Sequence, residues 1–147
     1  MILMKIFEAS KKTLTTSEKK EITSIYEELK KISSDDKIKE AVSLVKAKVT
    51  RLERSDDIHQ IALVTITKVL INEVLEKSES GFYMRRLALI SIAYLCDPYD
   101  VIPDSDPEYG YLDDIYVFYL ALSEIRRMNP DIYERIEIAY ARLNEDE

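Results

Sequence analysis

Residues 58–76 decide the fold, and they read Ile-His-Gln-Ile-Ala-Leu-Val-Thr-Ile-Thr-Lys-Val-Leu-Ile-Asn-Glu-Val-Leu-Glu. If this stretch is a helix, apolar side chains cover most of its sides and leave a thin polar stripe. A helix that is apolar on most sides is typical of the centre of a helical bundle. Ser55-Asp56-Asp57, directly before it, supplies side-chain oxygens that favour a helix start. The polar stripe consists of Thr65, Lys68, Asn72 and Glu76.

Start and stop signals on both sides of this stretch predict further helices. Thr15 and Glu18 have the spacing of a capping box, which predicts a helix directly after them. Asn129 followed by Pro130 predicts another helix start. The chain has only two glycines and four prolines, too few turn residues for a β-sandwich or barrel. We therefore predict an all-α fold: a single domain over residues 1–147, forming a compact bundle of about seven helices. The other helices are expected over residues 1–12, 38–52, 82–95 and 112–127.

Charge and composition argue against several classes of protein. The formal net charge of −7 disfavours a nucleic-acid-binding protein, because phosphate binding needs a clustered positive surface. The same charge predicts no binding to anionic vesicles at physiological salt. Cys96 is the only cysteine, so it cannot form an internal disulfide and is consistent with a cytoplasmic location. No signal peptide is recognisable. The uncharged run over residues 87–96 is about half of the roughly 20 residues that cross a bilayer, so no transmembrane span is expected.

The most informative stretch is residues 94–114, Tyr-Leu-Cys-Asp-Pro-Tyr-Asp-Val-Ile-Pro-Asp-Ser-Asp-Pro-Glu-Tyr-Gly-Tyr-Leu-Asp-Asp. Proline disfavours helical geometry in the residue before it, so the preceding helix ends near Asp97. Aspartates beside short turns accept hydrogen bonds from nearby backbone N–H groups. Asp113 and Asp114 fall in the first turn of the next helix, where free N–H groups and the helix dipole favour a carboxylate. We predict a rigid Asp/Pro-rich loop between two central helices. Its structural residues are Pro98, Asp100, Pro103, Asp104, Pro107, Gly110, Asp113 and Asp114.

This pattern resembles the signature of the YkvA-like domain family. The residues that carry the resemblance are Tyr94-Leu95, Pro98, Asp100, Ile102-Pro103-Asp104, Pro107, Gly110-Tyr111 and Asp113-Asp114. They define a family-like core of about residues 82–128. The resemblance implies a small helical domain with no established activity, of a kind often predicted to associate with membranes. Members usually have apolar residues where this chain has Ser105 and Asp106, and this departure argues against membrane insertion.

The carboxylates of the motif leave a second interpretation open. Asp97, Asp106 and Glu108 add to the motif aspartates, and carboxylate oxygens are ligands that hard divalent cations prefer. A calcium loop beginning at Asp104 would, however, have Tyr109 in place of its glycine and Ile115 in place of its last glutamate. A magnesium motif built on Asp113-Asp114 would need a third aspartate where the chain has Val117. We therefore favour caps and turn acceptors over a divalent metal site. The candidate metal ligands are Asp100, Asp104, Asp113 and Asp114.

Other residues give weaker signals for catalysis, and we predict no catalytic or cofactor-binding residue. His59 is the only histidine, and we expect it in the first turn of a helix, in contact with solvent. Cys96 has no basic neighbour in the sequence, so we expect a buried, inert thiol. Tyrosines surround the motif, and we expect most of them to pack with the hydroxyl at the surface, although such a group also suits a partner-binding patch. These are Tyr94, Tyr99, Tyr109, Tyr111, Tyr116 and Tyr119.

Together these patterns predict a non-enzymatic helical interaction or structural module. The expected partner is an unidentified protein, with peripheral contact to a membrane or a membrane protein as the resemblance implies. The alternative is a divalent-metal-dependent hydrolase that uses the carboxylates of residues 97–114, and the only cofactor considered is this cation. A narrow apolar stripe suits either a surface helix against the core or a dimer seam, so we expect a monomer or a weak homodimer. The stripe consists of Ile38, Val42, Val45, Val49 and Leu52.

Overall fold

The computed structural model describes residues 2–31, 43–54, 57–77, 81–96 and 111–145. The prediction of an all-α fold of about seven helices is confirmed, because the described residues form seven α-helices, one π-helical segment and no strand. The elements are α1 (Ile2–Thr13), α2 (Thr16–Lys31), α4 (Val45–Leu52), α5 (Ile58–Leu70), η1 (Ile71–Leu75), α6 (Phe82–Cys96), α7 (Leu112–Met128) and α8 (Pro130–Glu145).

Side chains near the predicted helix starts make the expected capping hydrogen bonds. The Glu18 N–H donates to Thr15 Oγ1 at 3.0 Å, and the Thr15 N–H donates to Glu18 Oε1 at 2.8 Å, so the capping box before α2 is formed. Asp57 Oδ1 accepts from the N–H groups of His59 at 2.9 Å and Gln60 at 3.1 Å, which caps α5. Asn129 does the same for α8, accepting from the Ile132 N–H at 3.2 Å. Ser33-Ser34-Asp35-Asp36, whose side chains favour a further helix start, lie outside the described residues.

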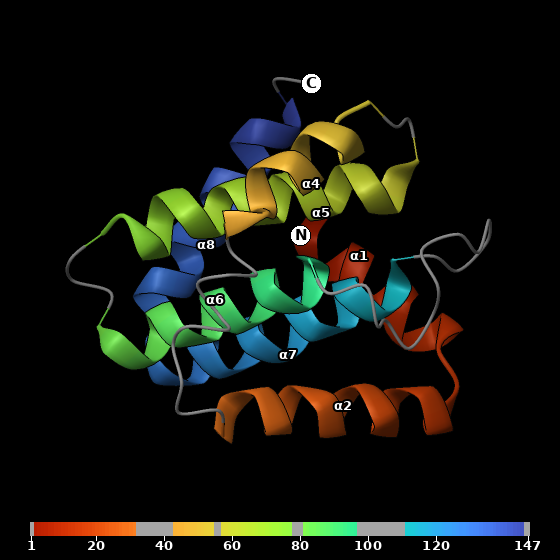
Figure 1. The fold of residues 1–147 in the computed structure, drawn as a ribbon. Coiled ribbons are helices and arrows are strands. Elements are labelled where there is room, and N and C mark those ends of the chain that lie inside the picture. The colour runs from red at the N-terminus through yellow and green to blue at the C-terminus, as the bar shows by residue number, and fades with distance from the viewer. Residues whose placement is uncertain (1, 32–42, 55–56, 78–80, 97–110, 146–147) are drawn as a thin grey trace.

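Helix α7 has the most central position in the bundle. It packs against α1, α2, α5, α6 and α8, and α6 and α7 share the most extensive contact of any helix pair. Figure 1 shows these two helices side by side in the middle of the molecule, with α2 on one side and α4 and α5 on the other. Helical spacing places four apolar side chains on one face of α7, and all of them are buried, namely Ile115, Phe118, Leu122 and Ile125. The core is therefore built around α7, with α5 and α6 packed on it.

Helix α5 is even more buried than its sequence predicts. Thr65 belongs to the polar stripe of the sequence, but its side chain is buried. Its hydroxyl donates to the Ile61 carbonyl at 3.0 Å, so it is buried without losing a hydrogen bond. Conversely Ile58, part of the predicted apolar surface, is exposed at the first position of the helix. Lys68 and Asn72, two other residues of the polar stripe, have exposed side chains.

The end of this helix adopts a π-helical turn that no sequence signal predicted. The Glu76 N–H donates at 3.0 Å to the carbonyl of Ile71, five residues earlier, which is the π-helical pattern. Arg135 of α8 holds this turn by donating from Nη2 to the Glu73 carbonyl at 3.2 Å. The Arg135 Nε atom also lies 3.7 Å from Glu73 Oε2. Packing of α8 therefore supplies partners to the turn.

The continuous helical segment Ile58–Leu75 is long and apolar enough to cross a membrane, judged by length and composition alone. The sequence argument against a span considered only uncharged runs, and this segment contains Lys68 and Glu73. Half of it is buried inside the protein, and the core helix of a protein in water passes the same test. The segment by itself is weak support for a membrane span.

Candidate functional site

The first turn of α7 brings two carboxylates into the core beside α6. The side chains of Asp113 and Asp114 are fully buried, at 0% exposure. The Tyr94 hydroxyl, from the last turns of α6, donates to Asp113 Oδ2 at 2.9 Å. This contact ties the end of α6 to the start of α7. Tyr94 is itself buried, so it is an exception to the expectation that most of these tyrosine hydroxyls lie at the surface.

The backbone that leads into α7 is held by two other helices. Tyr111, directly before α7, adopts the left-handed conformation with φ 73°, which costs a residue with a side chain about 1–2 kcal/mol. Ser10 of α1 donates from its hydroxyl to the Leu112 carbonyl at 3.2 Å. The ammonium group of Lys48, on α4, lies 5.3 Å from the centre of the Tyr111 ring, within cation–π range. The start of α7 is therefore fixed by contacts from α1, α4 and α6.

Most of the predicted site residues lie outside the described part of the chain. Residues 97–110 include Pro98, Asp100, Pro103, Asp104, Pro107 and Gly110, so the rigid loop, its turn acceptors and half of the candidate metal ligands stay predictions. Among the described residues, no group of three His, Cys, Asp or Glu side chains is arranged to hold a metal ion. Asp113 and Asp114 are the two candidates whose position is known, and they lie side by side in the same turn.

Cys96 and His59 each lie near one charged side chain. Burial raises the pKa of the half-buried Cys96 thiol, and the positive charge of Lys48 on α4 lowers it only in part. The sequence predicts a buried thiol without a basic neighbour, and the structure differs on both points, because the thiol is half-buried and Lys48 acts on it. The inertness of this thiol stays a prediction. The Nδ1 atom of His59 lies 3.8 Å from Asp57 Oδ1, and His59 is in the first turn of α5 as predicted.

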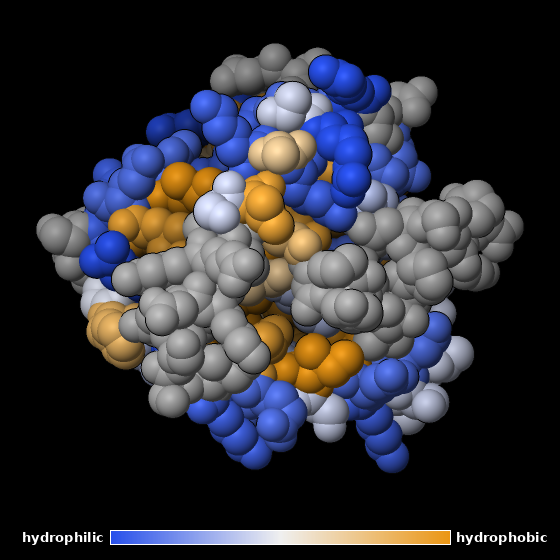
Figure 2. Space-filling view, in the orientation of Figure 1, coloured by the Kyte–Doolittle hydropathy of each residue, from blue (hydrophilic) through white to orange (hydrophobic). Residues whose placement is uncertain are grey.

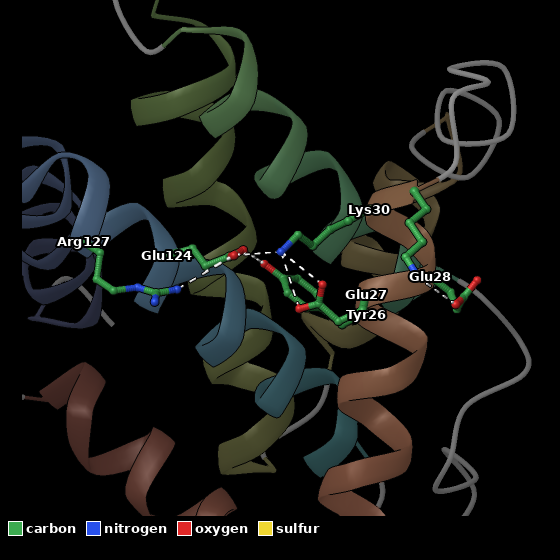
Figure 3. A network of polar contacts seen from close by, with 7 residues as sticks. Tyr26, Glu27, Glu28, Lys30, Glu124 and Arg127 are labelled. Carbon is green, nitrogen blue, oxygen red and sulfur yellow. Dashed lines mark hydrogen bonds and ion pairs between the residues drawn. The ribbon is translucent and has the colours of Figure 1, made fainter.

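A second polar cluster, which sequence reasoning missed, joins α2 to α7 (Figure 3). The Tyr26 hydroxyl donates to Glu124 Oε2, and Lys30 Nζ lies 2.8 Å from Glu124 Oε1. Lys30 also lies 3.4 Å from Glu27, and Arg127 lies 3.9 Å from Glu124. Burial and the hydrogen bond to Glu124 raise the pKa of Tyr26 well above its ordinary value. Burial alone would lower the pKa of Lys30, but its hydrogen bond with Glu124 and their attraction raise it.

Exposed aromatic side chains mark the start of α6. Phe82 is 76% exposed and Tyr83 is 43% exposed, while Met128 at the end of α7 is 49% exposed. In Figure 2 apolar atoms stand at the left margin of the molecule, where α6 begins in Figure 1. Helix α6 packs against both α2 and α7, and Figure 1 shows the two helices α6 and α7 side by side along their length. The start of α6 therefore lies beside the last turns of α7.

Two open depressions lie on the helices that cover the core. One, of about 440 Å³, runs over α2 and contains lysines together with Glu27 and Glu28. The other, of about 540 Å³, follows α4 and contains three cations and no carboxylate among its described residues. Neither contains Asp113 or Asp114.

A part of the chain that runs from α6 into α7 is similar to a known protein family. Residues 84–120 match the family described as "Protein of unknown function (DUF1232)". This match is consistent with the resemblance to the YkvA-like family, and it supports the assignment of a domain of unknown function. Neither a curated protein nor a solved structure matches the chain significantly.

Proposed function

We propose that this chain is a non-enzymatic interaction module that docks a protein partner. The observation that carries this proposal is the exposure of Phe82, Tyr83 and Met128 at one end of the α6–α7 pair. Aromatic residues and methionine are enriched in protein–protein interfaces, where they supply apolar contact area. We call these three residues the α6–α7 apolar end.

The antiparallel packing of α6 on α7 supports a single surface at this end. Tyr94 near the end of α6 meets Asp113 at the start of α7, and the two helices lie side by side along their length (Figure 1). A helix rises about 1.5 Å per residue, so this contact and the side-by-side packing place the first turn of α6 level with the last turns of α7. Arg127 is exposed beside Met128, and arginine is also common in interfaces. The chemistry of the apolar end suits a protein partner.

The burial of the motif carboxylates also favours an interaction module over an enzyme. Asp113 and Asp114 are closed off from solvent, and Tyr94 donates its hydroxyl hydrogen to Asp113. A carboxylate that catalyses hydrolysis must reach its substrate within hydrogen-bonding distance, directly or through one water. The alternative of a divalent-metal-dependent hydrolase rests on the position of these two carboxylates, because they directly follow the acidic residues of segment 97–110 in the chain.

The finer part of the proposal places the partner at a membrane or in a membrane protein, in the cytoplasm. This part follows from the resemblance to a family whose members are often predicted to associate with membranes. A protein that docks on a membrane protein needs no membrane-inserting surface of its own. It is therefore compatible with the net charge of −7, which opposes direct adsorption to an anionic bilayer.

Partner capture with matched surface variants tests the proposal. The full chain is fixed on beads and exposed to extract of the cells that produce it, and captured proteins are quantified by mass spectrometry. We expect a partner that binds the wild-type chain and is lost with Phe82→Asp. The matched control is Ile138→Asp on α8, which changes another exposed apolar residue outside the matched region and should retain the partner. If Phe82→Asp captures the same proteins as the wild type, the α6–α7 apolar end is not the docking surface.

A further inference from the structure

A second candidate surface lies along the exposed face of α4. Its described side chains occur at intervals of three and four residues, which places them on one face of the helix. They line the depression of about 540 Å³. We call this surface the α4 cationic trough, and it consists of Ser43, Lys46, Ala47, Thr50, Arg51 and Arg54.

The shape of the trough follows from the order of its residues around the helix. Successive residues of an α-helix are rotated by about 100°, so Ser43, Ala47 and Thr50 fall near the middle of this face. Lys46 lies on one side of them and Arg51 on the other, and Arg54 closes one end. Short side chains therefore form the floor, and long basic side chains form the rims. In Figure 2 the surface over α4 is mixed, with hydrophilic atoms beside apolar ones.

The positive charge of the trough is not neutralised within the described part of the chain. Lys46, Arg51 and Arg54 form no ion pair there, although the whole chain carries a net charge of −7. Glu53, the only acid between residues 43 and 54, points to α5 and lies 2.7 Å from Lys68. The α2 depression differs, because Glu28 pairs with Lys31 there at 3.5 Å and Glu27 with Lys30 at 3.4 Å.

We propose that the α4 cationic trough binds an acidic peptide segment of another protein. A linear chain that lies along the helix can present carboxylates to both rims, and charge complementarity favours such a partner over other proteins. Ala47 on the floor leaves room for its backbone. The proposal goes beyond the proposed function, because the trough is a different surface from the α6–α7 apolar end and can be tested without it.

The same geometry disfavours two other polyanions. The apolar side of α4 packs against the core, with Leu52 buried and Val45 and Val49 partly buried. Leu44, directly before the helix, is 55% exposed, but one side chain does not form an apolar face that can lie in a bilayer. Single-stranded nucleic acid is bound through stacking on aromatic side chains, and the described residues of the trough include none. A carboxylate-bearing peptide needs neither feature.

Binding of a synthetic acidic peptide to the full chain tests the proposal. The probe is a fluorescein-labelled peptide of about ten glutamates. At a rise of about 1.5 Å per residue as a helix or about 3.3 Å as an extended chain, it is long enough to cover the trough in either conformation. Fluorescence anisotropy is measured at low salt and at physiological salt. We expect saturable binding at low salt that weakens as salt is added, because the charges are exposed. The triple variant Lys46→Gln, Arg51→Gln, Arg54→Gln should weaken binding about tenfold or more, since several exposed ion pairs are lost together.

A matched control separates the trough from the net charge of the protein. Lys5, Lys12 and Lys20 are exposed lysines of α1 and α2 with no ion pair in the described residues. Their triple change to glutamine alters the net charge by the same amount, and we expect it to bind the peptide like the wild type. Circular dichroism checks that both triple variants keep their helical content.

Three results would overturn the proposal. The first is the absence of saturable peptide binding to the folded wild type at low salt. The second is an equal loss of binding in both triple variants, which would mean that only net charge matters. The third is binding of phosphatidylserine vesicles or an oligothymidine strand through Lys46, Arg51 and Arg54 without binding of the peptide. The variant Phe82→Asp should bind the peptide normally, so failure of the docking proposal leaves this result unaffected.

Discussion

The Asp113 carboxylate illustrates how a motif residue is used at the α6–α7 junction. Its side chain is buried and accepts a hydrogen bond from Tyr94, a residue nineteen positions earlier in the chain. Burying a carboxylate costs free energy unless hydrogen bonds replace its lost hydration. The hydrogen bond from Tyr94 therefore offsets part of the cost of burying Asp113, and it links α6 to α7. This dependence can be measured by changing either residue.

Replacing Asp113 separates a structural role from metal binding. Asp113→Ala should lower the free energy of unfolding by about 1–3 kcal/mol, because the Tyr94 hydroxyl loses this acceptor in a buried site. Asp113→Asn should recover a large part of that loss, since the amide oxygen still accepts a hydrogen bond. Urea denaturation measures both values. Calcium or magnesium at millimolar concentration should leave the wild-type melting temperature unchanged. A rise of several degrees that disappears in Asp104→Asn or Asp113→Asn would instead support the metal-dependent hydrolase.

Two threonines of α5 provide a second test at the scale of single residues. Both side chains are buried, but the Thr65 hydroxyl donates to Ile61, whereas the Thr67 hydroxyl has no hydrogen-bond partner among the described residues. A buried hydroxyl without a partner costs about 1–3 kcal/mol. Thr67→Val should therefore raise the free energy of unfolding by about 1 kcal/mol, while Thr65→Val should leave it unchanged or lower it. Equal effects of the two changes in thermal denaturation would contradict this account.

At the scale of helices, the attachment of α2 depends on one carboxylate of α7. Glu124 receives both the Tyr26 hydroxyl and the Lys30 ammonium group, and these two residues lie one turn apart on α2. Ile22 and Tyr26 are the fully buried residues of α2, so its apolar contact with the core is narrow. Only a few apolar side chains attach α2 to the core, so the polar contacts with Glu124 strengthen this attachment.

This polar attachment predicts a loss of stability at high pH. The pKa of Tyr26 is raised above its ordinary value of 10.0, so above about pH 10 the unfolded chain releases a proton that the folded chain keeps. Its stabilising contribution is thus fully present below pH 10 and is lost as the pH rises further. Tyr26→Phe should show a smaller fall in unfolding free energy between about pH 9 and pH 11 than the wild type. The slope that remains reports other groups, including Tyr133, whose pKa burial raises to about 12. Identical slopes in the two proteins would show that Tyr26 is not responsible.

At the scale of the whole molecule, charge and apolar surface are unevenly distributed. The net charge of −7 coexists with the α4 cationic trough, and the exposed apolar residues include the α6–α7 apolar end. A net charge far from zero opposes self-association of a protein, while a local surface of opposite charge can still attract a partner. Average composition therefore says little about which surface binds.

Self-association is predicted to be absent or weak. Val45 and Val49, two residues of the apolar stripe that suited a dimer seam, pack against the core of the same molecule, and Leu52 is buried there. Ile38 and Val42 lie outside the described residues. Sedimentation equilibrium at micromolar concentration should therefore give the mass of a monomer. A tight dimer that Val45→Glu abolishes without loss of helical content would place this helix at an interface instead.

Much of the fold was predictable because it depends on local rules. Capping residues such as Thr15, Asp57 and Asn129 act within three positions of themselves, so their spacing in the sequence is enough to predict helix starts. The inward face of α7 was predictable for a similar reason, because helical periodicity places Ile115, Phe118 and Ile125 on one side. The π-helical turn was not, since its polar partner Arg135 comes from α8.

In the candidate site, too, features that depend on neighbouring residues were predictable, and features that depend on helix packing were not. The sequence alone determined that Asp113 and Asp114 belong to the first turn of a helix within a recognisable family motif, because that depends on neighbouring residues. Only the tertiary structure decided that Tyr94 meets Asp113, that Lys48 lies near Cys96 and that Glu124 joins α2 to α7. These pairs are far apart in the chain, and their distances depend on how helices pack. The same reason applies to the α4 cationic trough: periodicity places its cations on one face, but the structure determines that this face points outward.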